Sequence, residues 1–314
     1  WFAEIATAGW QQRWLENFAA NQAGGGASVD LVQDGWTDLG KRIRERIGHI
    51  PKEQRTLDNM RAAFEEADFQ KMEEIRARVD AVVKDYETAQ RLKAWYRQLC
   101  KRPCFHDAYL QTFNLPNTHL IDTDGKGVAR ITETGVVVGS SEYPLDCIVY
   151  ASGFEVGTPF KRRAGFDLSG RDGVKLSQYW ANGMRSKHGI HVHGFPNAFF
   201  VTPTQGANLI SNVPHNLVDS ARTIAVTVKE ALARGAKEVE VSKEAEDAWV
   251  SLLLTNPGRM AGGAECTPGY YNNEGRDPGP AARLAVGYPA GPAAYFDYIE
   301  RWRASGQFDG IEFR

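Results

Sequence analysis

The stretch that decides how this chain is organised is Cys100-Lys101-Arg102-Pro103 (CKRP). It separates a charge-dense segment with helical periodicity from an apolar segment rich in strand-forming residues. Proline disfavours the α conformation for the residue before it, so a helix cannot easily continue through Arg102. The backbone is therefore predicted to turn here and to present two adjacent cations at a junction between segments. Such a pair suits a phosphate-bearing cofactor; taken alone, it also fits a solvated basic turn.

The composition is that of an ordinary globular protein. The chain has 314 residues, of which 42% are hydrophobic and 24% charged, and its formal net charge is −2. This length allows two domains, and the near-neutral charge gives no indication of a nucleic-acid partner or an anionic membrane surface. No apolar run reaches the roughly 18 residues of a membrane-spanning helix, and the opening WFAEIATAGWQQRW does not resemble a signal peptide. We therefore expect a cytoplasmic protein without nucleic-acid or membrane partners.

The cysteines and histidines do not form a recognisable metal motif. Four cysteines are spread along the chain, at Cys100, Cys104, Cys147 and Cys266. Such spacing is typical of reduced thiols in the cytoplasm. Three histidines lie close together, at His188, His191 and His193, but no carboxylate or cysteine stands at ligand spacing beside them. We interpret them as ordinary loop residues and expect no metal.

The first third of the chain is predicted to be helical. Residues 1–24 carry aromatic side chains at a spacing of four, and a glycine-rich break follows at residues 21–28 that lacks the features of a phosphate loop. Residues 30–96 show one apolar stripe on a charged background, which indicates amphipathic helices with a turn near Pro51. The members of this stripe are Phe69, Met72, Ile75, Val79, Val82 and Tyr86.

Beyond Arg102 the pattern changes to short strands. Residues 118–122 are predicted to form a strand, and residues 128–132 and 135–138 a hairpin. The apolar run 147–151 is typical of a strand buried on both faces of a parallel sheet. It ends in small residues, and ligands bind at such strand ends in open α/β sheets.

Turns, a short helix or loop, a further strand and a longer helix follow. Residues 170–173 (GRDG) are predicted to turn, residues 175–180 to begin a short helix or a loop, and residues 198–202 (AFFVT) to form another buried strand. A turn at 202–212 then leads into a helix that ends near Gly235, and the amino end of that helix offers positive potential to an electron-rich ligand. Its predicted core face consists of Leu217, Ala221, Ile224, Val228 and Leu232.

The last part of the chain combines helices with a long loop. Ser242 is a suitable cap for a helix that packs through Trp249, Leu252 and Leu253. The glycine- and proline-rich region 256–292 contains CTPGYYNNEG at 266–275, which we interpret as a lid or binding loop, with a plain surface loop as the alternative. A final helix is predicted at 293–304.

Five segments in this order and spacing resemble the flavin-dependent Baeyer–Villiger monooxygenases. They are CKRPCFHDAYLQTFNLPNTHLID (100–122), LDCIVYASGFEVGTPFKRRAGF (145–166), GRDGVKLSQYWANG (170–183), HGFPNAFF (193–200) and QGANLISNVPH (205–215). The resemblance is best over residues 90–255, and Ser152 departs from it because the family usually has threonine there. Each motif is moderately specific, and the five together are highly specific.

The resemblance implies an α/β flavoprotein with two Rossmann-like dinucleotide-binding domains, each interrupted in sequence, and a helical insertion. Residues 1–96 would be the insertion in the NADPH domain, residues 97–145 the returning part of that domain, and residues 146–314 the C-terminal part of the FAD domain with its loop. Such enzymes hold FAD, take electrons from NADPH, and use O₂ to convert a ketone into an ester or lactone through a flavin C4a-peroxide. The sequence of residues 266–275 resembles that of family members that accept bulky or cyclic ketones.

The glycine-rich turns that bind both pyrophosphates in this family do not occur in this sequence. We therefore expect the chain to be the C-terminal half of such an enzyme, to need the N-terminal half as a partner, and to be inactive and to bind FAD poorly alone.

The resemblance also assigns roles to individual residues. Arg102 would lie beside the flavin and stabilise the anionic peroxide, which is the catalytic role. The cofactor-binding residues would be Lys101 at the 2′-phosphate of NADPH, Gly206 and Asn208 at the flavin, and Tyr271 in a loop that folds over NADP. The substrate residues would be Leu209, Ile210 and Tyr270.

Two other functions remain open at this point. One is a related flavin monooxygenase that oxygenates nitrogen or sulfur. The other is a non-catalytic fragment that acts as a partner chain, which the missing glycine turns favour.

Overall fold

The computed structural model of the protein describes residues 2–22, 27–153, 159–202, 204–207, 211–256, 266–275 and 280–314. The chain divides into two compact units, one made of Trp1–Ala67 with Gly157–Arg314 and the other of Asp68–Val156. The predicted domain boundaries at residues 96 and 145 stay a prediction.

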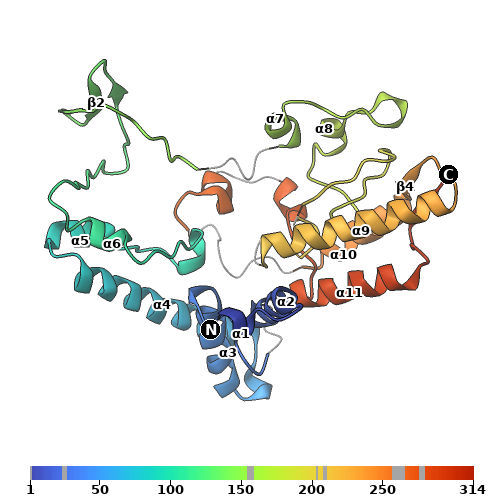
Figure 1. Ribbon diagram of the computed structural model, residues 1–314, viewed down its shortest axis with the longest axis horizontal. Coiled ribbons are helices and arrows are strands. Elements are labelled where there is room, and N and C mark those ends of the chain that lie inside the picture. The colour runs from blue at the N-terminus through green and yellow to red at the C-terminus, as the bar shows by residue number, and fades with distance from the viewer. Residues whose placement is uncertain are drawn as a thin grey trace. The chain divides into compact units, whose positions relative to one another are not determined.

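Helices predominate among the described elements (Figure 1). The α-helices are α1 (Phe2–Ile5), α2 (Trp10–Gln22), α3 (Gly35–His49), α4 (Leu57–Val82), α5 (Tyr86–Leu92), α6 (Tyr109–Thr112), α7 (Phe160–Ala164), α8 (Leu176–Tyr179), α9 (Val213–Ala233), α10 (Lys243–Leu253) and α11 (Pro292–Ser305). The short 3₁₀ helices are η1 (Lys52–Gln54), η2 (Gln98–Cys100), η3 (Arg171–Gly173), η4 (Tyr270–Gly275) and η5 (Pro280–Leu284). The strands are β1 (Arg130–Ile131), β2 (Gly135–Val138), β3 (Ser141–Pro144), β4 (Val239–Val241) and β5 (Ile311–Phe313).

The helical interpretation of residues 30–96 is confirmed. Asp34 caps α3 by accepting a hydrogen bond from the Trp36 amide, and the turn near Pro51 separates α3 from α4. The predicted stripe is only partly a core, because Met72 and Val79 are buried whereas Phe69 is 61% exposed. In the described part of the chain, no helix is long and apolar enough to cross a membrane.

The unit Asp68–Val156 contains a small apolar cluster and an antiparallel sheet. The cluster is formed by Val79, Val83 and Ala89, against which Leu110 and Phe113 pack. The predicted hairpin is confirmed as β1 and β2, and β3, which was not predicted, extends it into the order β1-β2-β3.

The other unit is built around α9, α10 and α11. Helices α9 and α11 lie side by side, and α2 packs against α11 (Figure 1). The predicted cap Ser242 accepts a hydrogen bond from the Ala245 amide at 3.2 Å and begins α10. The core between these helices is aromatic and consists of Ala207, Trp249, Leu253, Tyr295, Ile299, Trp302 and Phe308.

The predicted core face of α9 is wrong. Helix α9 buries a polar face instead, made of His215, Asn216, Asp219, Ser220, Thr223, Thr227 and Ala231. Leu232 on the predicted apolar face is 75% exposed and Val228 is 37% exposed. The polar face is the buried one because Arg303 of α11 binds it. The Nη1 atom of Arg303 lies 2.8 Å from Asp219 Oδ1 and 2.8 Å from Thr223 Oγ1.

Three predicted strands do not form in this structure. Residues 118–122 and 147–151 have no regular structure, and within 198–202 Phe199 makes only an isolated bridge to His191. Val149 is 84% exposed and Tyr150 is 73% exposed, so the run 147–151 is not buried as expected. A strand exists through hydrogen bonds to neighbouring strands, and the described residues pair no strand with 118–122 or 147–151.

Two buried carboxylates fix the irregular segment 185–200. Glu246 of α10 is fully buried and accepts hydrogen bonds from the His193 amide at 3.0 Å and from Tyr179 Oη at 2.5 Å. Glu240 of β4 accepts from the Gly194 amide at 2.8 Å and from Arg171 Nε at 2.9 Å. Arg171 lies in η3, where the GRDG turn was predicted, so this turn helps to hold the histidine-containing loop.

The two exposed cysteines, Cys104 and Cys147, are free, as expected of reduced thiols. The cytoplasmic location stays a prediction.

Candidate cofactor and substrate site

The cation pair Lys101–Arg102 follows directly on the short helix η2 (Gln98–Cys100). Lys101 has extended backbone, with φ −122° and ψ 158°, which ends the helical segment as predicted. Lys101 is half-buried and Arg102 is exposed. The Cys104 thiol donates to the carbonyl of Arg102 at 3.6 Å.

The approach to this pair is held by α4. The Gln98 amide donates to Asp68 Oδ1 at 3.0 Å, and Arg76 Nη1 donates to the carbonyl of Ala94 at 2.9 Å. The Arg76 guanidinium also lies over the Trp95 ring, 4.7 Å from its centre. Burial raises the pKa of Asp68, although the Gln98 amide and nearby arginines act against this shift. These contacts give the cation pair a fixed base, which the sequence did not indicate.

Gly206 lies in a fully buried turn between Gln205 and Ala207. A Cβ atom at Gly206 would lie 3.2 Å from Tyr295 Oη, closer than ordinary contact, so Tyr295 would have to move to admit any other residue. Tyr295 is fixed because its hydroxyl donates to the carbonyl of His188 at 3.1 Å. Close packing against Tyr295 therefore favours glycine at this position, and the approach of Gly206 to a flavin stays a prediction.

The amino end of α9 comes shortly after this turn. Asn212 caps the helix by accepting a hydrogen bond from the His215 amide at 3.1 Å, and no acidic residue lies in the first turn. The His215 ring stacks on Phe296 with 4.0 Å between ring centres, and burial lowers the pKa of His215. The positive end of this helix is therefore not neutralised by a carboxylate of its own first turn. The predicted residues Asn208, Leu209 and Ile210 lie outside the described residues.

The predicted loop residues Tyr270 and Tyr271 begin the 3₁₀ helix η4 (Tyr270–Gly275), and Tyr271 is half-buried. The loop is closed by one side chain that sequence reasoning did not single out, Asn272. Its Oδ1 atom accepts from the Gly269 amide at 2.9 Å, and its Nδ2 atom donates to the carbonyl of Cys266 at 2.9 Å. The pair Asn-Asn after two tyrosines was the available signal, because asparagine side chains commonly close turns.

Sequence reasoning also missed Gln205, which lies next to Gly206. It is fully buried and has a positive φ of 64°, an uncommon conformation for glutamine. The glycine after it predicted a turn, but nothing in the sequence showed which distant segments its side chain would reach.

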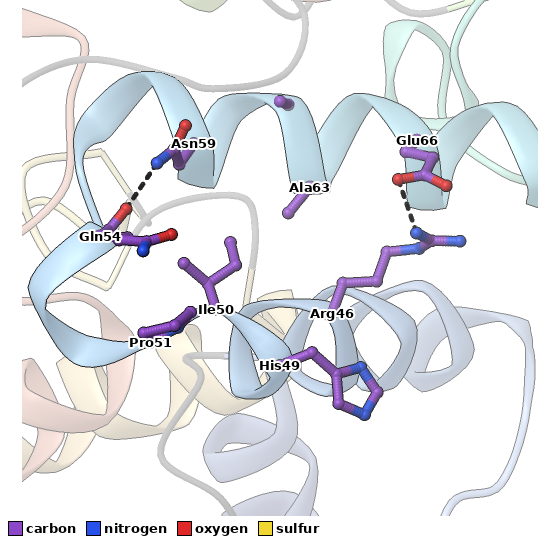
Figure 2. A pocket seen from close by; sticks show the side chains of 9 residues that line it. Arg46, His49, Ile50, Pro51, Gln54, Asn59, Ala63 and Glu66 are labelled. Carbon is purple, nitrogen blue, oxygen red and sulfur yellow. Dashed lines mark hydrogen bonds and ion pairs between the residues drawn. The ribbon is translucent and has the colours of Figure 1, made fainter.

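A hollow of about 470 Å³ lies between the end of α3 and the start of α4 (Figure 2). Arg46 and Glu66 form an ion pair of 2.7 Å across it, and Asn59 Nδ2 donates to the carbonyl of Gln54 at 2.6 Å. None of the predicted site residues lines this hollow. No group of three or more potential metal ligands was found among the described residues.

Comparison with known proteins gives relatives along nearly the whole chain. No family model matches the chain. Neopentalenolactone D synthase of Streptomyces avermitilis is 44% identical over 311 residues, which are 98% of this chain and 52% of that protein. Pentalenolactone D synthase of Streptomyces arenae is 45% identical over 326 residues, which cover 100% of this chain and 53% of that protein. A Baeyer-Villiger monooxygenase of Streptomyces coelicolor is 43% identical over 94% of this chain and 49% of its own length. The chain thus spans about half the length of these relatives.

Solved structures give the same result. The polycyclic ketone monooxygenase of the fungus Thermothelomyces thermophila has a TM-score of 0.85 and 34% identity, over 98% of this chain and 51% of that one. An oxidized steroid monooxygenase bound to NADP has a TM-score of 0.65 and 24% identity, over 79% of this chain and 45% of that one, which shows a shared fold.

The chain therefore carries part of the fold of a flavoprotein with two dinucleotide-binding domains. Its homologues and structural neighbours are Baeyer–Villiger monooxygenases, and it aligns with about half of each of them.

Proposed function

We propose that this chain is one half of an enzyme that inserts one oxygen atom of O₂ next to a ketone carbonyl, with FAD as cofactor and NADPH as reductant. One observation carries the proposal. The chain aligns along nearly its whole length with a polycyclic ketone monooxygenase at a TM-score of 0.85. Relatives that are 36–45% identical over at least 94% of the chain are named as synthases of pentalenolactone D or as Baeyer-Villiger monooxygenases.

The residues present fit the ring side of a bound flavin and the phosphate of NADPH. The amino end of α9 has no acidic residue in its first turn, which suits an electron-rich flavin edge. Gly206 and Asn208 would lie along the flavin, Lys101 would pair with the 2′-phosphate of NADPH, and Tyr271 would cover NADP. When bound, the flavin accepts a hydride from NADPH and activates O₂. The pyrophosphate-binding glycine turns would come from the N-terminal half of the enzyme.

Arg102 is the proposed catalytic residue. A guanidinium stays charged at any pH at which proteins work. A fixed cation lowers a barrier most where negative charge develops in a site that excludes water. Arg102 would hold that position beside the flavin, and its exposure here is in keeping with a surface that the other half of the enzyme covers.

The proposed substrate is a bulky or cyclic ketone. Leu209, Ile210 and Tyr270 would supply apolar contacts around its carbonyl-bearing ring. Support comes from the relatives, because one is named a polycyclic ketone monooxygenase. The proposed partners are the ketone, O₂ and the N-terminal half of the enzyme.

Unburied apolar surface supports the need for the N-terminal half. Val149 is 84% exposed and Tyr150 is 73% exposed, although their segment has the sequence of a buried strand. Exposed apolar surface of this kind is typical of an interaction site. We propose that the N-terminal half covers it, and that residues 97–145 and 146–314 then complete the NADPH and FAD domains with residues 1–96 as an insertion.

The experiment is to express this chain together with the N-terminal half of the enzyme and to supply NADPH, O₂ and a polycyclic ketone. The expected product is heavier than the ketone by one oxygen atom and is an ester or lactone. This chain alone is expected to be inactive. Oxygenation of an amine or thioether with no reaction of any ketone would overturn the assignment, as would turnover by this chain without its other half.

A further inference from the structure

Gln205 occupies a conformation that a glutamine adopts only under constraint. Its φ of 64° lies in the left-handed region, a backbone conformation that residues other than glycine and asparagine rarely adopt. The residue is fully buried. A strained backbone persists only where the surroundings over-determine it, and it often marks a functional position.

The side chain of Gln205 uses both ends of its amide. Its Oε1 atom accepts a hydrogen bond from Ser186 Oγ at 2.6 Å. Its Nε2 atom donates to the carbonyl of Met184 at 2.5 Å and to the carbonyl of Leu284 at 3.1 Å. Glutamate at this position would lose both donors and would place a buried charge against two carbonyl oxygens.

The backbone around Gln205 is paired with the same distant segment. The backbone amide of Gln205 donates to the carbonyl of Val286 at 2.9 Å, and the backbone amide of Tyr288 donates to the carbonyl of Gly206 at 2.9 Å. Trp249 of α10 donates from Nε1 to the carbonyl of Gln205 at 3.1 Å. One residue thus joins segments 184–186 and 284–288 and helix α10.

We propose that Gln205 is a positioning residue of the flavin site. Its amide locks the turn Gln205–Ala207 to the segment 284–288 and so fixes where Gly206 stands. This role rests on the proposed function, in which Gly206 lies along the flavin. Gln205 itself need not touch the cofactor.

The chain offers a matched control in Asn197. This residue also has a positive φ, 58°, and its amide also joins distant segments, with Nδ2 donating to the carbonyl of Lys237 at 3.0 Å and Oδ1 accepting from the Val239 amide at 2.9 Å. It has no bond to the turn at Gly206. Replacement by glycine at either position relieves the backbone and removes the amide bonds, and Asn197→Gly is expected to cost less stability because Asn197 is exposed whereas Gln205 is fully buried.

The test compares Gln205→Gly with Asn197→Gly in the complete enzyme, with the N-terminal half present. Gln205→Gly is expected to shift the flavin absorption bands, to raise the hydrogen peroxide released per NADPH at least tenfold, and to speed hydrogen exchange of the Tyr288 amide at least tenfold. Asn197→Gly is expected to leave all three at wild-type values. Equal flavin spectra and equal peroxide release in the two variants would overturn the proposal.

Ser186→Ala provides a milder variant if Gln205→Gly does not fold. It removes one bond to the Gln205 amide and is expected to shift the same readouts in the same direction by a smaller amount; wild-type values for all three would count against the proposal. A wild-type enzyme that binds flavin but oxidises no ketone would overturn the proposed function and leave the role of Gln205 standing. A wild-type enzyme that binds no flavin would overturn both.

Discussion

At the scale of single residues, Arg102 and the buried histidines depend on their surroundings in opposite ways. Arg102 is exposed two residues after the short helix η2, and a guanidinium stays charged whatever its neighbours are. His188 and His191 are buried beside Lys187 and stay neutral because of their surroundings. Each case gives a prediction.

Arg102→Ala in the complete enzyme is expected to lower ester formation by a factor of about 100 or more, the usual cost of removing a group that stabilises developing charge. Reduction of the flavin by NADPH should survive, because the role proposed for Arg102 begins after hydride transfer. Stopped-flow absorbance separates the two steps. Arg91→Ala, which removes another exposed cation of the same unit, should leave both unchanged. Ester formation at normal rates in Arg102→Ala would remove the catalytic assignment.

The buried histidines predict acid sensitivity of folding. Burial and the charge of Lys187 lower the pKa of His191 from 6.5 to about 3, and burial lowers that of His188 well below 6.5. Above pH 6.5 these histidines are neutral in both the folded and the unfolded chain. Below it the unfolded chain binds protons that the folded chain refuses, so stability falls by up to about 1.4 kcal/mol per pH unit for each histidine.

Urea unfolding between pH 7 and pH 4 measures this dependence. His191→Gln is expected to flatten the slope, whereas replacement of the exposed His49 by glutamine should not change it. An unchanged slope in His191→Gln would show that the acid sensitivity has another origin.

At the scale of elements, the pairing of α9 with α11 depends on one buried ion pair. Asp219 is 9% exposed at its side chain, and Arg303 is 6% exposed. Burial raises the pKa of Asp219, and Arg303 acts against that shift. The carboxylate therefore depends on its partner to stay charged.

Arg303→Met is expected to cost about 3–5 kcal/mol, because it leaves a buried carboxylate without its cation. The loss should shrink at low pH, where Asp219 is protonated. Arg301→Met on the same helix should cost less than about 0.5 kcal/mol, because the pair of Arg301 with Asp297 is exposed on both sides. Chemical denaturation of the three proteins compares them directly. Similar losses for the two variants would show that the buried pair Asp219–Arg303 stabilises the fold no more than an exposed pair does.

The elements show why helices were predictable and several strands were not. A helix satisfies its own backbone, so α3, α4, α9, α10 and α11 follow from periodicity and capping residues such as Ser242. A strand needs a neighbour, and the run 147–151 has the sequence of a buried strand without one among the described residues. The inward face of α9 was misjudged for a related reason, because Arg303, 84 residues after Asp219, makes its polar side the buried one.

At the scale of the whole molecule, the sequence could predict candidate site residues but not the contacts that hold them in place. Motif order pointed to Lys101, Arg102 and Gly206. The residues that hold these positions are Asp68, Gln205 and Tyr295, and they act through contacts with residues distant in sequence. Such contacts leave no local pattern.

The exposed apolar surface predicts how the chain assembles. Val149→Lys should leave the unfolding of this chain unchanged, because Val149 is 84% exposed, and should weaken binding to the proposed N-terminal half at least tenfold. Leu57→Lys, at a site 72% exposed at the start of α4, is the matched control and should leave binding unaffected. Titration calorimetry with the separately purified half measures both. Equal affinity for the two variants would place the interface elsewhere.

The loop 266–275 is closed by the carboxamide of Asn272, a group that neither gains nor loses a proton at any pH an enzyme meets. The hydrogen bonds of Asn272 that close this loop are therefore equally stable in acid and in base. If Tyr271 covers a bound dinucleotide, a pH profile of dinucleotide affinity would report the ionisation of the phosphate and of the cations facing it. Opening of the loop 266–275 would not contribute to that profile.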